Sequence, residues 1–137
     1  MKVKGKVGVW IDLDRAVLIG IHGDTHTVVT LDSPVEHRVR TEGERKDFSR
    51  FGDQYIDHER SREARREQQI RQYARAVAAH LSGAEQIVIF GPAQMKDWLR
   101  KTILEQPILA SRLKAVESAD SMTESQMVAW VRDYFTP

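Results

Sequence analysis

The stretch Gln86–Leu99, QIVIFGPAQMKDWL, decides the fold class of this chain. Its opening residues, 86–90, form a short and continuous apolar run, which is typical of a strand covered on both faces. Gly91-Pro92 ends the run and predicts a tight turn into a helix over about 93–105. Because a buried strand, a turn and a helix make half of an α/β unit, this stretch predicts an α/β domain.

The residues that follow repeat this order of strand and helix. Leu113–Glu117 (LKAVE) reads as a second strand. Thr123 and Gln126 have the spacing of a capping box, in which each side chain bonds the backbone N–H of the other residue. They predict the start of a final helix that continues to about Phe135. This half of the chain therefore predicts parallel strands with helices on the faces of the sheet.

The N-terminal part predicts antiparallel strands and then a loop. Four β-branched or apolar runs are separated by short turn-like residues, and in chain order they are Val7–Leu13, Arg15–His22, Thr25–Leu31 and Val35–Arg40. The charged residues 41–57 follow neither a strand period nor a helix period, so we expect a long mobile loop there. From about 58 to 81, apolar residues at helical spacing predict one long helix.

This long helix carries a local excess of positive charge. Between positions 60 and 75 there are six arginines and only two glutamates. Arg62, Arg65 and Arg66 share one helical face, where their guanidinium groups can grip phosphate oxygens. The alternative is a solvated helix, in which acidic residues pair with arginines three or four positions later: Glu59 with Arg62, Glu63 with Arg66 and Glu67 with Arg71.

Composition limits the classes of function. The chain of 137 residues has 21 basic and 20 acidic residues, a net charge of +1, so its overall charge does not attract nucleic acid. The absence of cysteine excludes thiol catalysis and cysteine zinc sites, and it fits a reducing compartment, so we expect a cytoplasmic protein. The start of the chain matches neither a signal peptide nor a membrane span. No cofactor motif is found, and Trp10, Trp98 and Trp130 are expected in the core.

Residues 50–135 resemble the middle domain of archaeal and eukaryotic class-one peptide release factors and of the ribosome-rescue protein Pelota, including their short bacterial relatives. The resemblance rests on the arginine-rich helix at 62–81, on QIVIFGPAQMKDWL at 86–99 and on VESADSMTESQMVAWV at 116–131. The opening hairpin with its WID string resembles the first strands of the same ribonuclease-H-like fold. We therefore expect a single α/β domain over 1–137, with a mixed sheet of five or six strands flanked by three helices.

The resemblance implies a protein that contacts ribosomal RNA or tRNA. Its implied RNA-binding residues are Arg60, Arg62, Arg65, Arg66 and Lys96. In release factors, the loop before the long helix holds a Gly-Gly-Gln tripeptide that places a water for hydrolysis of peptidyl-tRNA. This chain has Gly52, Asp53 and Gln54 instead. Asp53 puts a negative side chain where a bare backbone must approach RNA, so we expect no peptide release.

Two other functions compete with this hypothesis. The first is a protein-interaction module that forms a homodimer through a sheet edge or a helix face and binds no nucleic acid. The second is a magnesium-dependent nuclease of the ribonuclease-H-like type, because Asp12, Asp14 and Asp120 stand at expected strand ends. Strand alternation puts Asp12 and Asp14 on one face, which suits a metal ion, although both residues also suit a hairpin turn.

Overall fold

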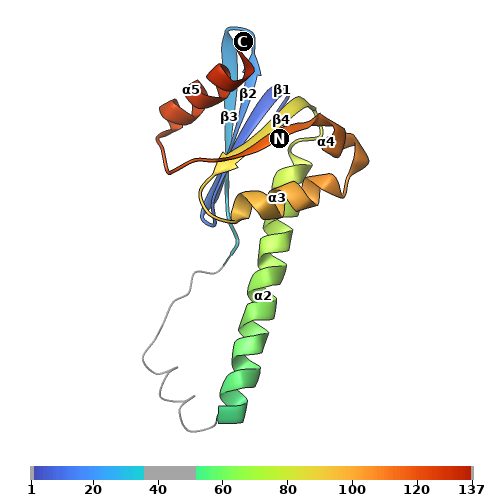
Figure 1. The fold of residues 1–137 in the computed structure, drawn as a ribbon, viewed down its shortest axis with the longest axis vertical. Coiled ribbons are helices and arrows are strands. Elements are labelled where there is room, and N and C mark those ends of the chain that lie inside the picture. Colours follow the sequence, from blue (N-terminus) through green and yellow to red (C-terminus); the bar gives the residue numbers. More distant parts are fainter. Residues whose placement is uncertain (1, 36–51, 137) are drawn as a thin grey trace.

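The computed structural model describes residues 2–35 and 52–136, and for residues 52–58 it describes the backbone alone. A five-stranded mixed sheet has the strand order β3-β2-β1-β4-β5 (Figure 1). The elements in chain order are β1 (Gly5–Ile11), β2 (Arg15–His22), β3 (Thr25–Asp32), α2 (Gly52–Ala79), β4 (Ala84–Gly91), α3 (Met95–Leu104), α4 (Pro107–Arg112), β5 (Leu113–Ser118) and α5 (Glu124–Phe135). The predicted α/β class and mixed sheet are confirmed.

Local hydrogen bonds explain how the chain folds back into its antiparallel strands. Strands β1, β2 and β3 pair antiparallel, whereas β4 pairs parallel with both β1 and β5. Between β1 and β2, Oδ1 of Asp12 accepts hydrogen bonds from the N–H groups of Asp14 (2.8 Å) and Arg15 (2.9 Å). This side-chain turn closes the predicted hairpin. Between β2 and β3, Gly23 takes the positive φ (60°) that the turn requires.

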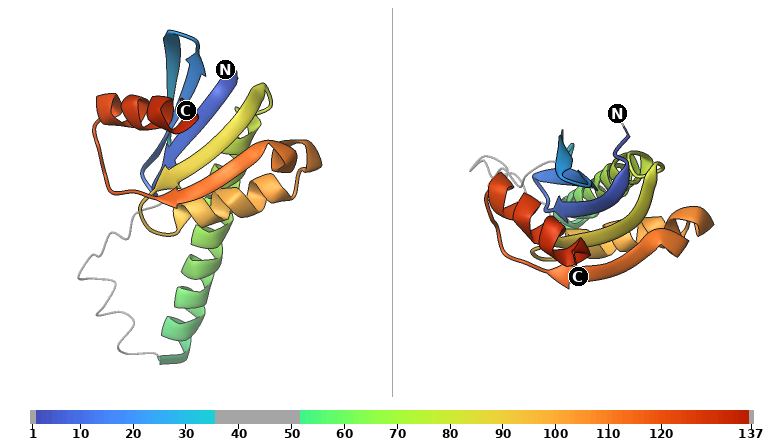
Figure 2. Two further views of the ribbon diagram at one scale, coloured as in Figure 1. Left: turned by 45° about the horizontal axis from the view of Figure 1, so that its top comes forward. Right: turned by 90° about the horizontal axis from the view of Figure 1, so that it is seen from above.

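Each face of the sheet has its own apolar core. Helices α2 and α3 cover one face and α5 covers the other (Figure 2). A Cβ at Gly8 would lie 2.2 Å from Cγ2 of Val131, so glycine is what lets α5 approach β1 this closely. The predicted capping box at Thr123 and Gln126 is present and starts α5.

Helix α2 is the longest element, and only part of it packs against the sheet. Its 28 residues span about 42 Å at 1.5 Å per residue. The end nearest β4 is buried through Tyr73, Ala74, Val77 and Ala78. The other end projects away from the sheet (Figure 1). We call residues 59–69 of α2 the arm; their side chains are exposed or half-buried, and none is fully buried.

Two details of the predicted fold are wrong, and one element was not predicted. Residues 52–57, predicted as loop, form the first turns of α2; they lack an apolar stripe, so periodicity could not detect them. The three predicted helices are present, and the described residues contain a fourth, α4, whose six residues are too few to show a period. Strand β3 ends at Asp32 and Val35 lies outside any strand. The remainder of the predicted fourth strand and of the predicted loop, 36–51, falls outside the described residues.

Candidate nucleic-acid interface

The arm carries the arginines that the sequence singled out. Arg60, Arg65 and Arg66 are exposed, and Arg62 is half-buried. We call Arg62, Arg65 and Arg66 the arm ridge. Within the described part of the chain, no ion pair holds Arg65 or Arg66, so their guanidinium groups are open to an anionic partner.

The alternative, a solvated helix in which acidic residues pair with nearby arginines, is only partly observed. Glu67 and Arg71 form the expected pair, with Oε1 and Nη2 2.7 Å apart and the side chains 50% and 54% exposed. Such exposed pairs contribute about 0.2–0.5 kcal/mol. Arg66, the expected partner of Glu63, makes no ion pair among the residues that the structure describes.

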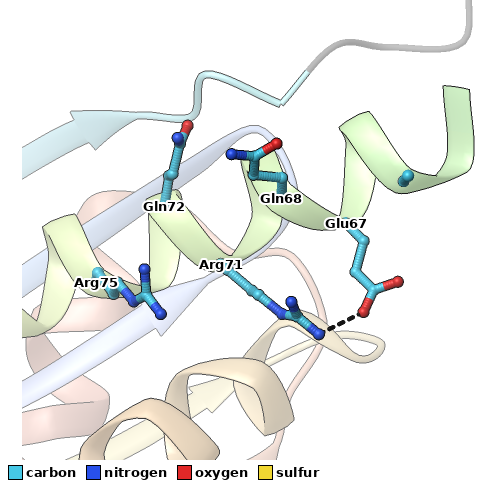
Figure 3. Close-up of a pocket in the computed structure, with 6 residues that line it drawn as sticks. Glu67, Gln68, Arg71, Gln72 and Arg75 are labelled. Atoms are coloured by element: carbon cyan, nitrogen blue, oxygen red, sulfur yellow. Dashed lines mark hydrogen bonds and ion pairs between the residues drawn. The ribbon is translucent and has the colours of Figure 1, made fainter. Parts of the chain in front are cut away.

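A second polar surface lies on α2 closer to the body. It is a hollow of about 400 Å³, and the described residues that line it are Ala64, Glu67, Gln68, Arg71, Gln72 and Arg75 (Figure 3). We call it the α2 hollow. In Figure 3 the two glutamines point to one side of the helix and the two arginines to the other. All six residues are exposed, so a ligand would meet guanidinium and amide groups together.

Helix α3 adds a tryptophan and a lysine next to this hollow. Cζ of Arg71 lies 6.0 Å from the ring centroid of Trp98, and Nζ of Lys101 lies 5.7 Å from the same centroid. Trp98 is half-buried and packs against the core only in part, so its prediction as a core residue is half right. The electron-rich ring attracts each of the two cations.

Tyr73 fixes α2 to the sheet where the helix leaves the body. Its hydroxyl donates a hydrogen bond to the backbone oxygen of Asp12, 3.0 Å away. Burial raises the pKa of Tyr73 well above its usual range, and the carboxylates of Asp12, Asp14 and Asp32 raise it further. The hydroxyl therefore stays protonated and keeps its hydrogen bond at physiological pH.

The remaining predicted RNA-contacting residues are placed as follows. Gly52, Asp53 and Gln54 are the first residues of α2 rather than part of a loop, and their side chains fall outside the described structure. Lys96 stands in the first turn of α3, where its Nζ donates a hydrogen bond to the backbone oxygen of Ala93. It is half-buried and belongs to a different helix from the arm ridge.

The candidate metal ligands serve turns and packing. Oδ1 of Asp12 is occupied by the hairpin turn, while Asp14 and Asp120 are exposed. The backbone oxygen of Asp120 accepts a hydrogen bond from Nε1 of Trp10 at 3.4 Å. Among the described residues, no group of three or more His, Cys, Asp or Glu side chains could hold a metal ion. The nuclease hypothesis therefore gains no support from this part of the chain.

The sequence reasoning missed the α2 hollow. It counted Arg71 and Arg75 in the local charge but assigned them no site, and it passed over Gln68 and Gln72. The signal was present, because both pairs are spaced by four residues and so lie on neighbouring lines of one helix face. What the sequence could not show is that α3 brings Trp98 and Lys101 beside that face.

Comparisons with known proteins support the fold. No family model matches the sequence, and no curated protein matches it. Among solved structures, the chain is similar to the archaeal translation termination factor aRF1, with a TM-score of 0.52 and 12% sequence identity. The match covers 93% of this chain and 38% of that factor. At this identity the likeness shows a release-factor-like fold.

No helix in the described ranges 2–35 and 52–136 has the length and apolar character needed to cross a membrane.

Proposed function

We propose that this protein associates with the ribosome or with tRNA in the cytoplasm and contacts RNA through the arm of α2. The observation that carries the proposal is the arm itself: Arg60, Arg65 and Arg66 are exposed on a helix that projects from a release-factor-like domain. Within the described structure no carboxylate neutralises Arg65 or Arg66. Guanidinium groups bind phosphate through paired hydrogen bonds, and the binding releases counterions from RNA.

In this proposal, the protein binds RNA but does not release peptides. Asp53 replaces the central glycine of the release tripeptide, and its carboxylate would be repelled by the phosphates around a tRNA ester. We expect no hydrolysis of peptidyl-tRNA by the native protein, and Asp53→Gly should raise any residual activity. Gln54→Ala should leave RNA binding unchanged. Robust peptide release by the unmodified protein would contradict this part of the proposal.

Sedimentation with ribosomes tests the proposal. The purified protein should pellet with ribosomes at low salt and detach steeply as salt rises, because counterion release makes log K fall linearly with log salt. The protein alone, centrifuged under the same conditions, is the control. A protein that stays in the supernatant with ribosomes at low salt contradicts the proposal.

Self-association is the second candidate function, and one observation favours it. Leu104 and Ile108 are 46% and 67% exposed at the corner between α3 and α4, close to the edge strand β5. Large exposed apolar side chains are typical of protein interfaces. Sedimentation velocity separates the two functions, since a dimer formed through these residues persists at high salt whereas an RNA complex does not.

A further inference from the structure

We infer that the α2 hollow, together with Trp98 and Lys101 of α3, is a second RNA contact that binds the backbone of a single unpaired strand. The inference rests on the proposed function, because it concerns the same helix and the same class of partner. It assigns the strand to residues that are separate from the arm ridge. Variants of the hollow and variants of the arm ridge can therefore distinguish failure of this inference from failure of the proposed function.

The hollow and the arm ridge face different directions. The hollow residues follow the spacing i, i+3, i+4, i+7, i+8 and i+11, starting from Ala64. At 3.6 residues per turn, the centre of this line is rotated about 140° around α2 from the centre of the arm ridge. One flat surface cannot contact both sets of arginines at once. A segment bound in the hollow would therefore be different from a segment bound on the arm ridge.

Charge favours a phosphate-bearing partner. Arg71 and Arg75 line the hollow and Lys101 contacts the same Trp98 ring as Arg71, whereas Glu67 is the acidic residue among the described lining residues. Arg75 is exposed and has no ion pair within the described structure. Glu67 binds Arg71 at Nη2, which leaves other guanidinium N–H groups of Arg71 for a phosphate. The Trp98 ring attracts both Arg71 and Lys101, so these two cations are already placed next to α3 before any ligand arrives.

The amide groups favour an unpaired RNA strand. Gln68 and Gln72 each present both a donor and an acceptor on the opposite side of the hollow from the arginines. Such amides can bond the ribose 2′-hydroxyl and the edges of bases, and base edges are accessible in unpaired RNA. The volume of about 400 Å³ is within the range of small-ligand sites, and all the described lining residues are exposed to a ligand.

The test measures binding of a fluorescein-labelled ten-nucleotide oligo(A) RNA by fluorescence anisotropy across a range of salt. The variant Arg71→Gln/Arg75→Gln removes both charges and keeps helix-forming side chains. We expect its affinity to fall about tenfold near 0.1 M salt, and its salt slope to flatten by about 1.4, which is the loss of two phosphate contacts on a single strand. The control Lys6→Gln/Lys114→Gln removes the same charge from exposed positions on the sheet and should bind like the native protein.

Trp98 gives a second readout at the site itself. Intrinsic fluorescence should change when the RNA is added, and Trp98→Phe should remove this change, since phosphates that bind Arg71 and Lys101 alter the charge next to that ring. Circular dichroism melting shows whether each variant is folded. A variant that melts early is replaced by Arg75→Gln alone, which alters one exposed side chain.

The outcomes separate the two claims. If Arg71→Gln/Arg75→Gln binds oligo(A) like the native protein while an arm-ridge variant binds more weakly, the inference is wrong and the proposed function stands. If the native protein pellets with ribosomes but does not bind oligo(A), the inference alone is wrong, and if it binds neither, both are wrong. If a polyglutamate peptide competes with oligo(A) as well as unlabelled oligo(A) does, the hollow is a site for acidic protein segments and the inference is overturned.

Discussion

The two ends of α2 are parts of one continuous helix, yet different interactions stabilise them. Near β4 the helix buries Tyr73, Ala74, Val77 and Ala78 against the sheet and α3. Along the arm none of the described side chains is fully buried. Isolated helices are marginal in water, so the arm depends on the packed end for its nucleus. One end of α2 therefore stabilises the fold, whereas the side chains of the other end can change without loss of core packing.

The largest effect is expected at the packed end. Val77→Asp puts an uncompensated carboxylate at a fully buried position, and we expect the free energy of unfolding to fall by about 3–5 kcal/mol. The matched change in the arm, Ala64→Asp, alters an exposed residue and should cost no more than about 0.5 kcal/mol. Urea denaturation measures both values. Equal losses would show that the two ends of α2 do not differ as described.

Tyr73 tests the boundary between the two ends. Tyr73→Phe removes the hydrogen bond to the backbone oxygen of Asp12, and we expect a loss of about 1 kcal/mol near neutral pH. Because the pKa of Tyr73 is raised in the folded state, its stabilisation is complete below pH 10, the ordinary value, and is lost as pH rises above it. The unfolding free energy of the native protein should therefore fall more steeply above pH 10 than that of Tyr73→Phe. Parallel curves would contradict the assigned burial of the hydroxyl.

The smallest effect is expected within the arm, at Glu67. Glu67→Gln breaks the pair with Arg71, and because both side chains are about half exposed we expect a cost of only about 0.3 kcal/mol. The same change removes a negative charge from the hollow and should strengthen RNA binding slightly. Thermal melting and anisotropy measure the two effects. Weaker RNA binding by Glu67→Gln would indicate that the ion pair itself positions Arg71.

The sequence predicted those parts of the fold that have a strong local pattern. The run 86–90 appears as β4, and the spacing of Thr123 and Gln126 appears as the cap of α5. Helix α4 escaped prediction because its six residues are too few to show a period. The start of α2 escaped because a polar helix stabilised by its neighbouring turns has no apolar stripe.

The candidate site was predictable only where it lies within one helix. The arginines of the arm could be found from their spacing, because a single helix fixes their common face. The cations beside Trp98 come from two helices, and the packing of α2 against α3 brings them together. The sequence of either helix alone does not predict how close these cations lie to Trp98. Single-helix surfaces can thus be predicted from sequence, whereas sites built between elements depend on the fold.

We propose that the arm ridge binds RNA, whereas the packed end of α2 stabilises the fold. The most direct test compares ribosome binding by the native protein and by Arg62→Ala/Arg65→Ala/Arg66→Ala across a range of salt, with thermal melting of both proteins alongside. We predict that the variant binds more weakly, that its salt slope flattens by about one unit per lost contact, and that it melts like the native protein. An unchanged salt slope in a folded variant would contradict this proposal and favour the alternative, in which the arm ridge is a solvated helix face.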